Sequence, residues 1–169
     1  GAEQLSEQLG IDLLALLEAE KATGKVGEVV RFPVPLGGPE NADLRWVFLV
    51  GVGDGGADAL RRAGATLARA TLGRSSVATS IASLSACAGL EAFVVGAVLG
   101  SFSFSWRSTE RPEKAPVARL VLTGCAEDRR PALERGLALG GAGWRARMLA
   151  TGPSNLKNPP WLAEQARLV

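Results

Sequence analysis

Residues 51–56 (GVGDGG) have the spacing that comes nearest to a ligand-binding motif in this sequence. They match the pattern GxGxxG between a strand-like apolar run and a helical pattern, the setting in which helix N-terminal amides hold a pyrophosphate. That fingerprint also needs an acidic residue about 20 residues further on, and residues 74–90 contain none. Asp54, inside the loop, would repel a phosphate. We therefore interpret residues 51–56 as a glycine-rich turn rather than a cofactor site.

The residue types that nucleophilic catalysis and metal binding need are scarce. The chain has 0 histidines, which excludes Ser-His-Asp and Cys-His systems and every histidine metal site. Cys87 and Cys125 form no CxxC pair, so we expect two free thiols, as is typical of a reducing cytosol. Ser154 has no GxSxG elbow around it, and we expect Asn155 to cap or bridge a turn. The residues thus predict no catalytic, cofactor-binding or metal-binding position.

Charged and aromatic residues are spread along the chain. Nineteen Lys and Arg against 17 Asp and Glu give a net charge of +2, too near neutral to indicate a nucleic acid partner. The acidic pairs lie at loop or helix-start spacings, where carboxylates complement the helix dipole; they are Asp54 with Asp58, Glu110 with Glu113, and Glu127 with Asp128. The four tryptophans form no base-stacking array; they are Trp46, Trp106, Trp144 and Trp161. Five arginines could form a weak basic face, which we interpret as a solvated helix face; they are Arg129, Arg130, Arg135, Arg145 and Arg147.

Hydrophobic periodicity places these residues on alternating helices and strands. Leucines at helical spacing predict one helix over residues 5–19, and further helices are expected from residue 55, over 91–100 and over 128–150. Apolar or β-branched runs predict strands at 27–34, 45–52, 76–83 and 117–123. With 169 residues, 47% of them hydrophobic and 21% charged, the pattern indicates one α/β domain with helices on both faces of a largely parallel or mixed sheet.

Residues 92–104 are almost wholly apolar and contain a GxxxG pattern at Gly96 and Gly100. About 13 residues are too few to cross a bilayer, which takes roughly 20. We therefore expect a buried helix whose backbone packs closely at both glycines, with Leu99 and Phe102 in the core and facing the sheet.

Residues 151–160 (TGPSNLKNPP) contain three prolines, which end the preceding helix. Because proline restricts the backbone, we expect an ordered, extended interdomain linker there, followed by a new helix near Trp161. The chain starts at Gly1 without methionine and ends inside this helix, so we expect it to be a fragment of a longer protein.

Three segments carry a resemblance to a known family. Residues 150–163 (ATGPSNLKNPPWLA) resemble the interdomain junction of the leucyl aminopeptidases of the cytosol aminopeptidase family, with Thr151 and Gly152 replacing the usual pair before Pro153. Residues 95–104 (VGAVLGSFSF) are similar to a family helix written G-x-x-L-G-x-Y-x-F, with Phe102 where tyrosine is usual. Residues 47–53 are similar to the family's "lvGlG" element.

The resemblance implies a macro-domain-like fold, a three-layer α/β/α arrangement with a mixed sheet. It implies a macro-like N-terminal domain over residues 1–150, an interdomain linker at 151–160 and the start of a truncated catalytic domain at 161–169. The family's two divalent metals, Mn or Zn, and their ligands and catalytic residues would lie beyond the junction. The family's first strand would precede Gly1, so we expect an edge strand or even an interior strand to be missing.

The function implied is that of a non-catalytic N-terminal domain of a two-metal leucyl aminopeptidase, a metalloexopeptidase that releases N-terminal amino acids from peptides. We expect an assembly or regulatory role, a cytoplasmic homo-hexamer as the parent, contact with its own catalytic domain, and no membrane partner. Two alternatives stay open: a macro-like module that binds a nucleotide or ADP-ribose near residues 51–56, and a nucleic-acid-binding accessory domain. We do not expect a nucleic acid partner.

Overall fold

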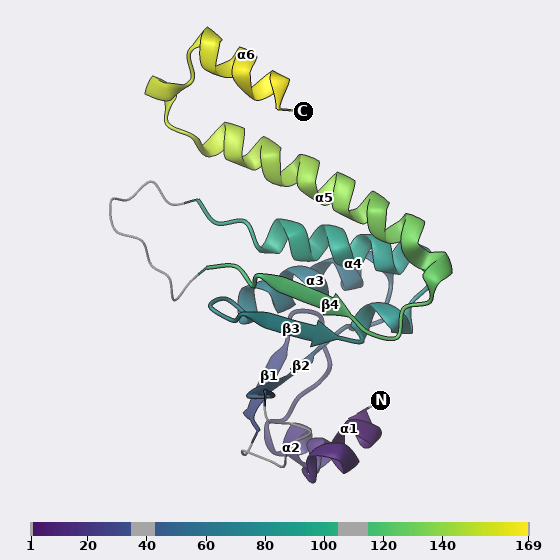
Figure 1. Ribbon diagram of the computed structural model, residues 1–169. Helices are drawn as coiled ribbons and strands as arrows, with labels where there is room; N and C mark the ends of the chain where they lie inside the picture. The colour runs from purple at the N-terminus through teal and green to yellow at the C-terminus, as the bar shows by residue number, and fades with distance from the viewer. Residues whose placement is uncertain (1, 35–42, 105–114, 169) are drawn as a thin grey trace.

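Helices and strands alternate along most of the chain in the computed structural model, which describes residues 2–34, 43–104 and 115–168 (Figure 1). The fold is mixed α/β with helices over small sheets, so the predicted fold class is confirmed. The elements are α1 (Ala2–Leu9), α2 (Leu13–Ala19), β1 (Val29–Pro33), β2 (Trp46–Val50), α3 (Ala57–Ala70), β3 (Ser76–Thr79), α4 (Cys87–Gly100), β4 (Arg119–Leu122), α5 (Arg130–Thr151) and α6 (Pro159–Arg167), with 3-10 turns at η2 (Ile81–Leu84), η4 (Glu127–Arg129) and η5 (Ser154–Leu156).

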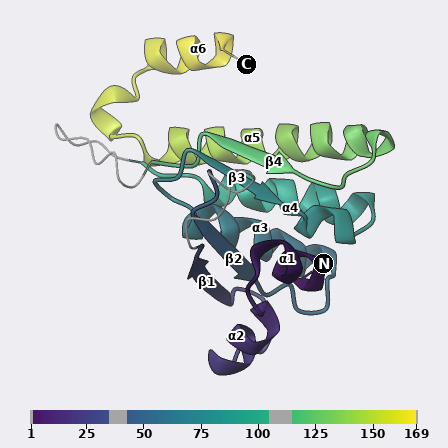
Figure 2. The ribbon, with the colours of Figure 1, turned by 60° about the horizontal axis from the view of Figure 1, so that its bottom comes forward.

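The four described strands form two separate pairs. β1 and β2 are antiparallel, with Val29 opposite Val50, whereas β3 and β4 are parallel, with Ser76 opposite Arg119. Helices α3, α4 and α5 are stacked on one side of the β3–β4 pair, and α1 and α2 lie near β1 and β2 (Figures 1 and 2). The positions of the strands follow the sequence prediction, but their division into two pairs does not.

The single helix expected over residues 5–19 is wrong, because the chain breaks between α1 and α2. Gly10 adopts a φ of 63°, a left-handed conformation that favours glycine. Asp12 then caps α2, its Oδ1 accepting the N–H groups of Leu14 at 3.1 Å and Ala15 at 3.0 Å. The leucine periodicity continues across the break because both helices contribute to one hydrophobic cluster around Leu13.

The predicted close packing at the GxxxG glycines is confirmed. A Cβ at Gly96 would overlap the carbonyl oxygen of Arg61 on α3 and lie 2.7 Å from its carbonyl carbon. A Cβ at Gly100 would lie 2.5 Å from the Cα of Ala65. The backbones of α3 and α4 therefore approach closely at both glycines, and Phe93 of α4 is completely buried in the hydrophobic core. No helix in the described ranges is both long and apolar enough to cross a membrane.

The expectation that Leu99 and Phe102 lie in the core, facing the sheet, is wrong. Both are half-buried, and they face α5 instead. A Cβ at Gly143 of α5 would lie 2.9 Å from Leu99 Cδ2, and the ring of Phe102 meets that of Trp144 edge-on, with centroids 5.4 Å apart. Periodicity could not tell these faces apart, since α4 lies between α3 and α5 and is apolar all round.

The segment after α5 is not fully extended, contrary to the expectation for residues 151–160. It contains the turn η5, and α6 begins at Pro159, two residues before the expected start. Asn158 caps α6, its Oδ1 accepting the N–H of Trp161 at 2.8 Å, whereas Asn155 lies exposed within η5. The domain boundaries at 150 and 160 stay predictions.

Candidate functional site

The glycine-rich turn between β2 and α3 is filled by the chain itself. Asp54 Oδ1 accepts the N–H of Gly56 at 3.0 Å, so a carboxylate occupies the helix-start amide that a phosphate would use. Gly53 donates its N–H to the carbonyl of Gly24 at 3.0 Å, and a Cβ at Gly51 would overlap the carbonyl oxygen of Lys25. The close approach of residues 24–26 therefore accounts for these glycines. That the turn binds no nucleotide stays a prediction.

Glu28 fixes the segment that covers this turn, a role that no sequence pattern indicated. Its carboxylate accepts the N–H of Thr23 at 2.9 Å and the Thr23 hydroxyl at 3.2 Å. Desolvation acts to raise the pKa of Glu28, but hydrogen bonds from Thr23, Gly24 and Lys25 outweigh it, so the pKa is lowered. The ionised carboxylate thus holds residues 23–28 in their loop.

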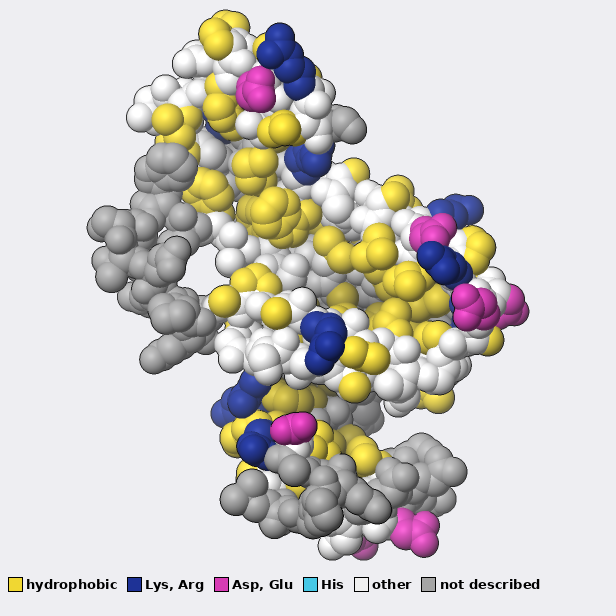
Figure 3. All heavy atoms as spheres, in the orientation of Figure 1, with side chains coloured by type: hydrophobic (Ala, Val, Ile, Leu, Met, Phe, Trp, Pro, Cys, Tyr) yellow, Lys and Arg dark blue, Asp and Glu magenta, His cyan; other side chains and the backbone are white. Residues whose placement is uncertain are grey.

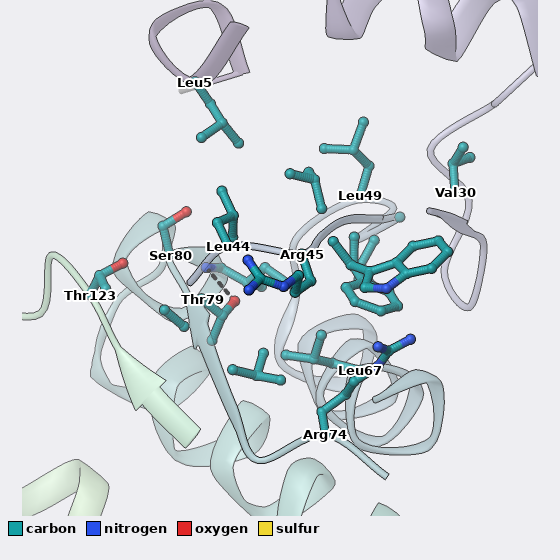
Figure 4. Close-up of a pocket in the computed structure, with 18 of the residues that line it drawn as sticks. Leu5, Val30, Leu44, Arg45, Leu49, Leu67, Arg74, Thr79, Ser80 and Thr123 are labelled. Carbon is teal, nitrogen blue, oxygen red and sulfur yellow. Dashed lines mark hydrogen bonds between the residues drawn. The ribbon is translucent and has the colours of Figure 1, made fainter. Parts of the chain in front are cut away.

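A cavity of about 1450 Å³ lies between the two strand pairs and is lined by every residue of β2 and β3. We call it the inter-sheet groove. Leu5 of α1 and Leu67 of α3 lie on opposite sides of it, and Leu44 and Arg45 lie between them (Figure 4). Thr79, Ser80 and Thr123 add polar atoms to its lining. Of its residues, the sequence analysis named Trp46 and Gly51 as candidates, but neither for this groove, since no local pattern shows that two distant strands fail to meet.

Trp46 lies at this groove between two arginines. The guanidinium carbon of Arg74 is 5.1 Å from the centroid of the Trp46 ring system, and that of Arg31 is 6.0 Å away. These are cation–π distances. Both guanidinium groups therefore help to hold the indole in place, a structural role for Trp46.

The five arginines of the suspected basic face all have bonding partners. Arg129 Nη1 donates to the carbonyl of Ala82 at 3.1 Å, and Arg147 Nη1 to that of Leu99 at 3.0 Å. The remaining three bond Glu134, Glu91 and the carbonyl of Leu168; they are Arg130, Arg135 and Arg145. Four of the five thus join separate parts of the chain rather than forming one free cationic surface.

The other candidate residues form no site in the described ranges. Cys87 and Cys125 are free thiols, as expected, and Ser154 is exposed within η5. No three His, Cys, Asp or Glu side chains among the described residues are placed to hold a metal ion. The described residues therefore do not fit the two-metal centre that the resemblance implies for the parent. Trp106, Glu110 and Glu113 lie outside the described residues.

Comparison with known proteins agrees with the resemblance noted in the sequence. A family model described as the N-terminal domain of the cytosol aminopeptidase family matches residues 1–111. A probable cytosol aminopeptidase of Streptomyces avermitilis is 34% identical, over 99% of this chain and 35% of its own length. One of Rhodococcus jostii is 30% identical, over 96% of this chain and 33% of its own length. The chain therefore spans about a third of the length of these relatives.

Solved structures show the same fold. The bottromycin maturation enzyme BotP in complex with Mn superimposes with a TM-score of 0.72 and 26% identity, covering 91% of this chain and 32% of that one. A variant of tomato leucine aminopeptidase superimposes with a TM-score of 0.74 and 23% identity, covering 98% of this chain and 33% of that one. With a family model over 111 of its 169 residues and relatives matched over nearly its whole length, the chain belongs to the cytosol aminopeptidase family and corresponds to its N-terminal domain.

Proposed function

We propose that residues 1–169 act as a non-catalytic N-terminal domain of a two-metal leucyl aminopeptidase, with a role in its assembly or regulation. Family membership and the share of the relatives' length that the chain spans support this proposal. In it, two divalent metals, Mn or Zn, and the groups that hydrolyse the peptide lie in a catalytic domain outside this chain. The manganese in the BotP complex supports metal use by the parent. In this proposal the parent is a homo-hexamer and is located in the cytoplasm. The printed name of the relatives, probable cytosol aminopeptidase, supports the location.

The observation that carries the assembly role is an apolar surface on the outer helix. Hydrophobic side chains gather over α5 and β4 on the face shown in Figure 3. The exposed large ones on these two elements are Leu137, Leu139, Trp144 and Val121, with exposed fractions of 50%, 55%, 38% and 40%. The outer face of a solvated helix is normally polar, and contiguous exposed apolar surface marks an interaction site. We assign this surface to contact with the catalytic domain.

Two measurements test the proposal. Purified residues 1–169 should release no leucine from a chromogenic leucyl amide with Mn or Zn added; release that survives a control for contaminating peptidases would contradict a non-catalytic role. In the full-length aminopeptidase, Leu137→Asp should reduce activity and the assembled fraction in sedimentation. Leu14→Asp, at a leucine of α2 with a similar exposed fraction of 49%, is the control and should do neither. Equal behaviour of the two variants would overturn the assembly role of this surface.

A further inference from the structure

A second cavity lies between α6 and the stacked helices α4 and α5, and residues from all three segments line it. We call it the α6 cavity. Its volume of about 470 Å³ is within the roughly 300–1,000 Å³ of small-molecule sites, which occur preferentially at domain interfaces. α6 runs beside the C-terminal half of α5 (Figures 1 and 2) and is expected to begin the catalytic domain. The α6 cavity therefore lies where the two domains are expected to meet.

α6 lies over this cavity without filling it. No residue of α6 is buried. Arg145 of α5 holds the end of α6, because its Nη1 donates to the carbonyl of Leu168 at 3.1 Å. Leu168 lines the cavity and is nevertheless 61% exposed. The α6 cavity is therefore open to solvent, and a small molecule can reach it.

Apolar side chains make up much of the cavity wall. Val98 comes from α4, and Trp144 and Met148 come from α5. The ring of Phe102 meets that of Trp144 edge-on, with centroids 5.4 Å apart, which helps to fix the indole. An apolar group that enters the cavity removes these side chains from water, and this burial favours binding. Trp144 also belongs to the apolar surface assigned above to the catalytic domain, so the cavity opens beside that contact.

The charge in the wall belongs to Arg145, which is half-buried. Neither aspartate nor glutamate lines the cavity, and no salt bridge between described residues includes Arg145. A guanidinium has five N–H donors in a fork that matches a carboxylate. Its bond to the neutral carbonyl of Leu168 leaves the charge uncompensated. A purely apolar occupant would bury that charge without a partner, which costs free energy, whereas a carboxylate would neutralise it.

We propose that the α6 cavity binds a small carboxylate with an apolar tail, of which a medium-chain fatty acid is the simplest example. The tail lies against Val98, Trp144 and Met148, and the carboxylate accepts N–H groups of Arg145. The bound molecule contacts α5 and α6 together and so stabilises the junction between the two domains. This inference rests on the assembly or regulatory role proposed above and names a ligand for it. Binding does not require peptidase activity, so it can fail while that role stands.

The test compares octanoate with octanol, which has the same tail without the charge, in calorimetric titrations of the full-length aminopeptidase. Octanoate should bind at least tenfold more tightly than octanol. Arg145→Met keeps an apolar stem and removes the charge, so it should weaken octanoate at least tenfold and change octanol binding little. Arg167→Met is the matched control, because Arg167 of α6 pairs with Glu164 at 3.5 Å and does not line the cavity. It should leave the binding of both ligands unchanged.

Two further variants place the ligand in the cavity. The isotope-labelled methyl group of Met148, assigned by the loss of its signal in Met148→Leu, should shift in NMR spectra as octanoate is added. Gly141 lines the cavity with nothing within 4 Å of the position of its Cβ, so Gly141→Leu should fill the space and block both ligands.

Five results would each overturn the proposal. They are no binding of octanoate at about 1 mM, equal binding of octanol, equal behaviour of Arg145→Met and Arg167→Met, no shift of the Met148 signal, and unchanged binding in Gly141→Leu. A catalytic domain that already fills the cavity gives the first of these results.

Discussion

Replacing Gly96 with alanine should force α4 away from α3. The added Cβ would overlap the carbonyl oxygen of Arg61 and lie 2.7 Å from its carbonyl carbon and 3.0 Å from its Cα. These atoms belong to the backbone in the middle of a helix, so no side-chain rotation can relieve the overlap. The helices must separate, and the contacts around Phe93 must loosen with them.

The expected loss of stability follows from two opposing terms. Overpacking of a well-packed interface costs about 1–3 kcal/mol, and a rigid backbone neighbour places this site at the upper end. Alanine regains about 1 kcal/mol over glycine through helix propensity. Gly96→Ala should therefore lower the free energy of unfolding by about 2 kcal/mol, or roughly 4–8 °C in melting temperature for a chain of this size.

Gly141→Ala is the matched control, since Gly141 lies in α5 with nothing within 4 Å of the position of its Cβ. It should gain up to about 1 kcal/mol from propensity alone. Urea titrations followed by far-ultraviolet circular dichroism would measure both variants beside the unchanged chain. Equal unfolding midpoints for Gly96→Ala and Gly141→Ala would refute the close packing of α3 on α4.

Four other outcomes are expected. Phe93→Ala should lower the free energy of unfolding by about 3–5 kcal/mol, and Leu99→Ala by clearly less because Leu99 is only half-buried; equal losses in urea titrations would contradict this order. Calorimetry with NAD and with ADP-ribose should show no binding tighter than about 1 mM, roughly −4 kcal/mol, since residues 24–26 cover the glycine turn, and a micromolar constant would support a ligand-binding module instead. The lowered pKa of Glu28 makes its ionised form stabilising above the ordinary value of 4.5, and this contribution is lost as pH falls through the lower folded value. Glu28→Gln should therefore be less stable than the unchanged chain at pH 7 but not at pH 2, and an equal difference at both would exclude ionisation as the cause. In sedimentation, residues 1–169 should be a monomer or weak dimer, and a stable hexamer would place the assembly interface in this domain alone.

Local sequence patterns were enough to locate most of the elements. The expected strand at 45–52 contains β2, and the expected helix at 128–150 coincides closely with α5. Helices and strands repeat every 3.6 and 2 residues, so their burial pattern is written into neighbouring positions. The glycines at 96 and 100 could be recognised for the same reason, because one turn of helix brings both to one face.

The break at Gly10 was not predicted, because the helical spacing of the leucines is a stronger pattern than a single glycine. The leucine spacing continued through it, and the capping role of Asp12 depends on a turn that the pattern concealed. The orientation of Leu99 also escaped, since a helix buried on several sides gives no periodic signal for its neighbours.

The sequence by itself determined the family, the fold class and the absence of histidine chemistry. The tertiary structure alone decided which strands pair and which edges stay open. The parallel pair joins residues as distant as Ser76 and Arg119, and the groove lies between that pair and β2. Backbone N–H and C=O groups are the same at almost every residue, so no residue type marks the edge that lacks a partner. That edge is defined only when distant segments meet, which is why the groove could be seen in the folded chain and not in the sequence.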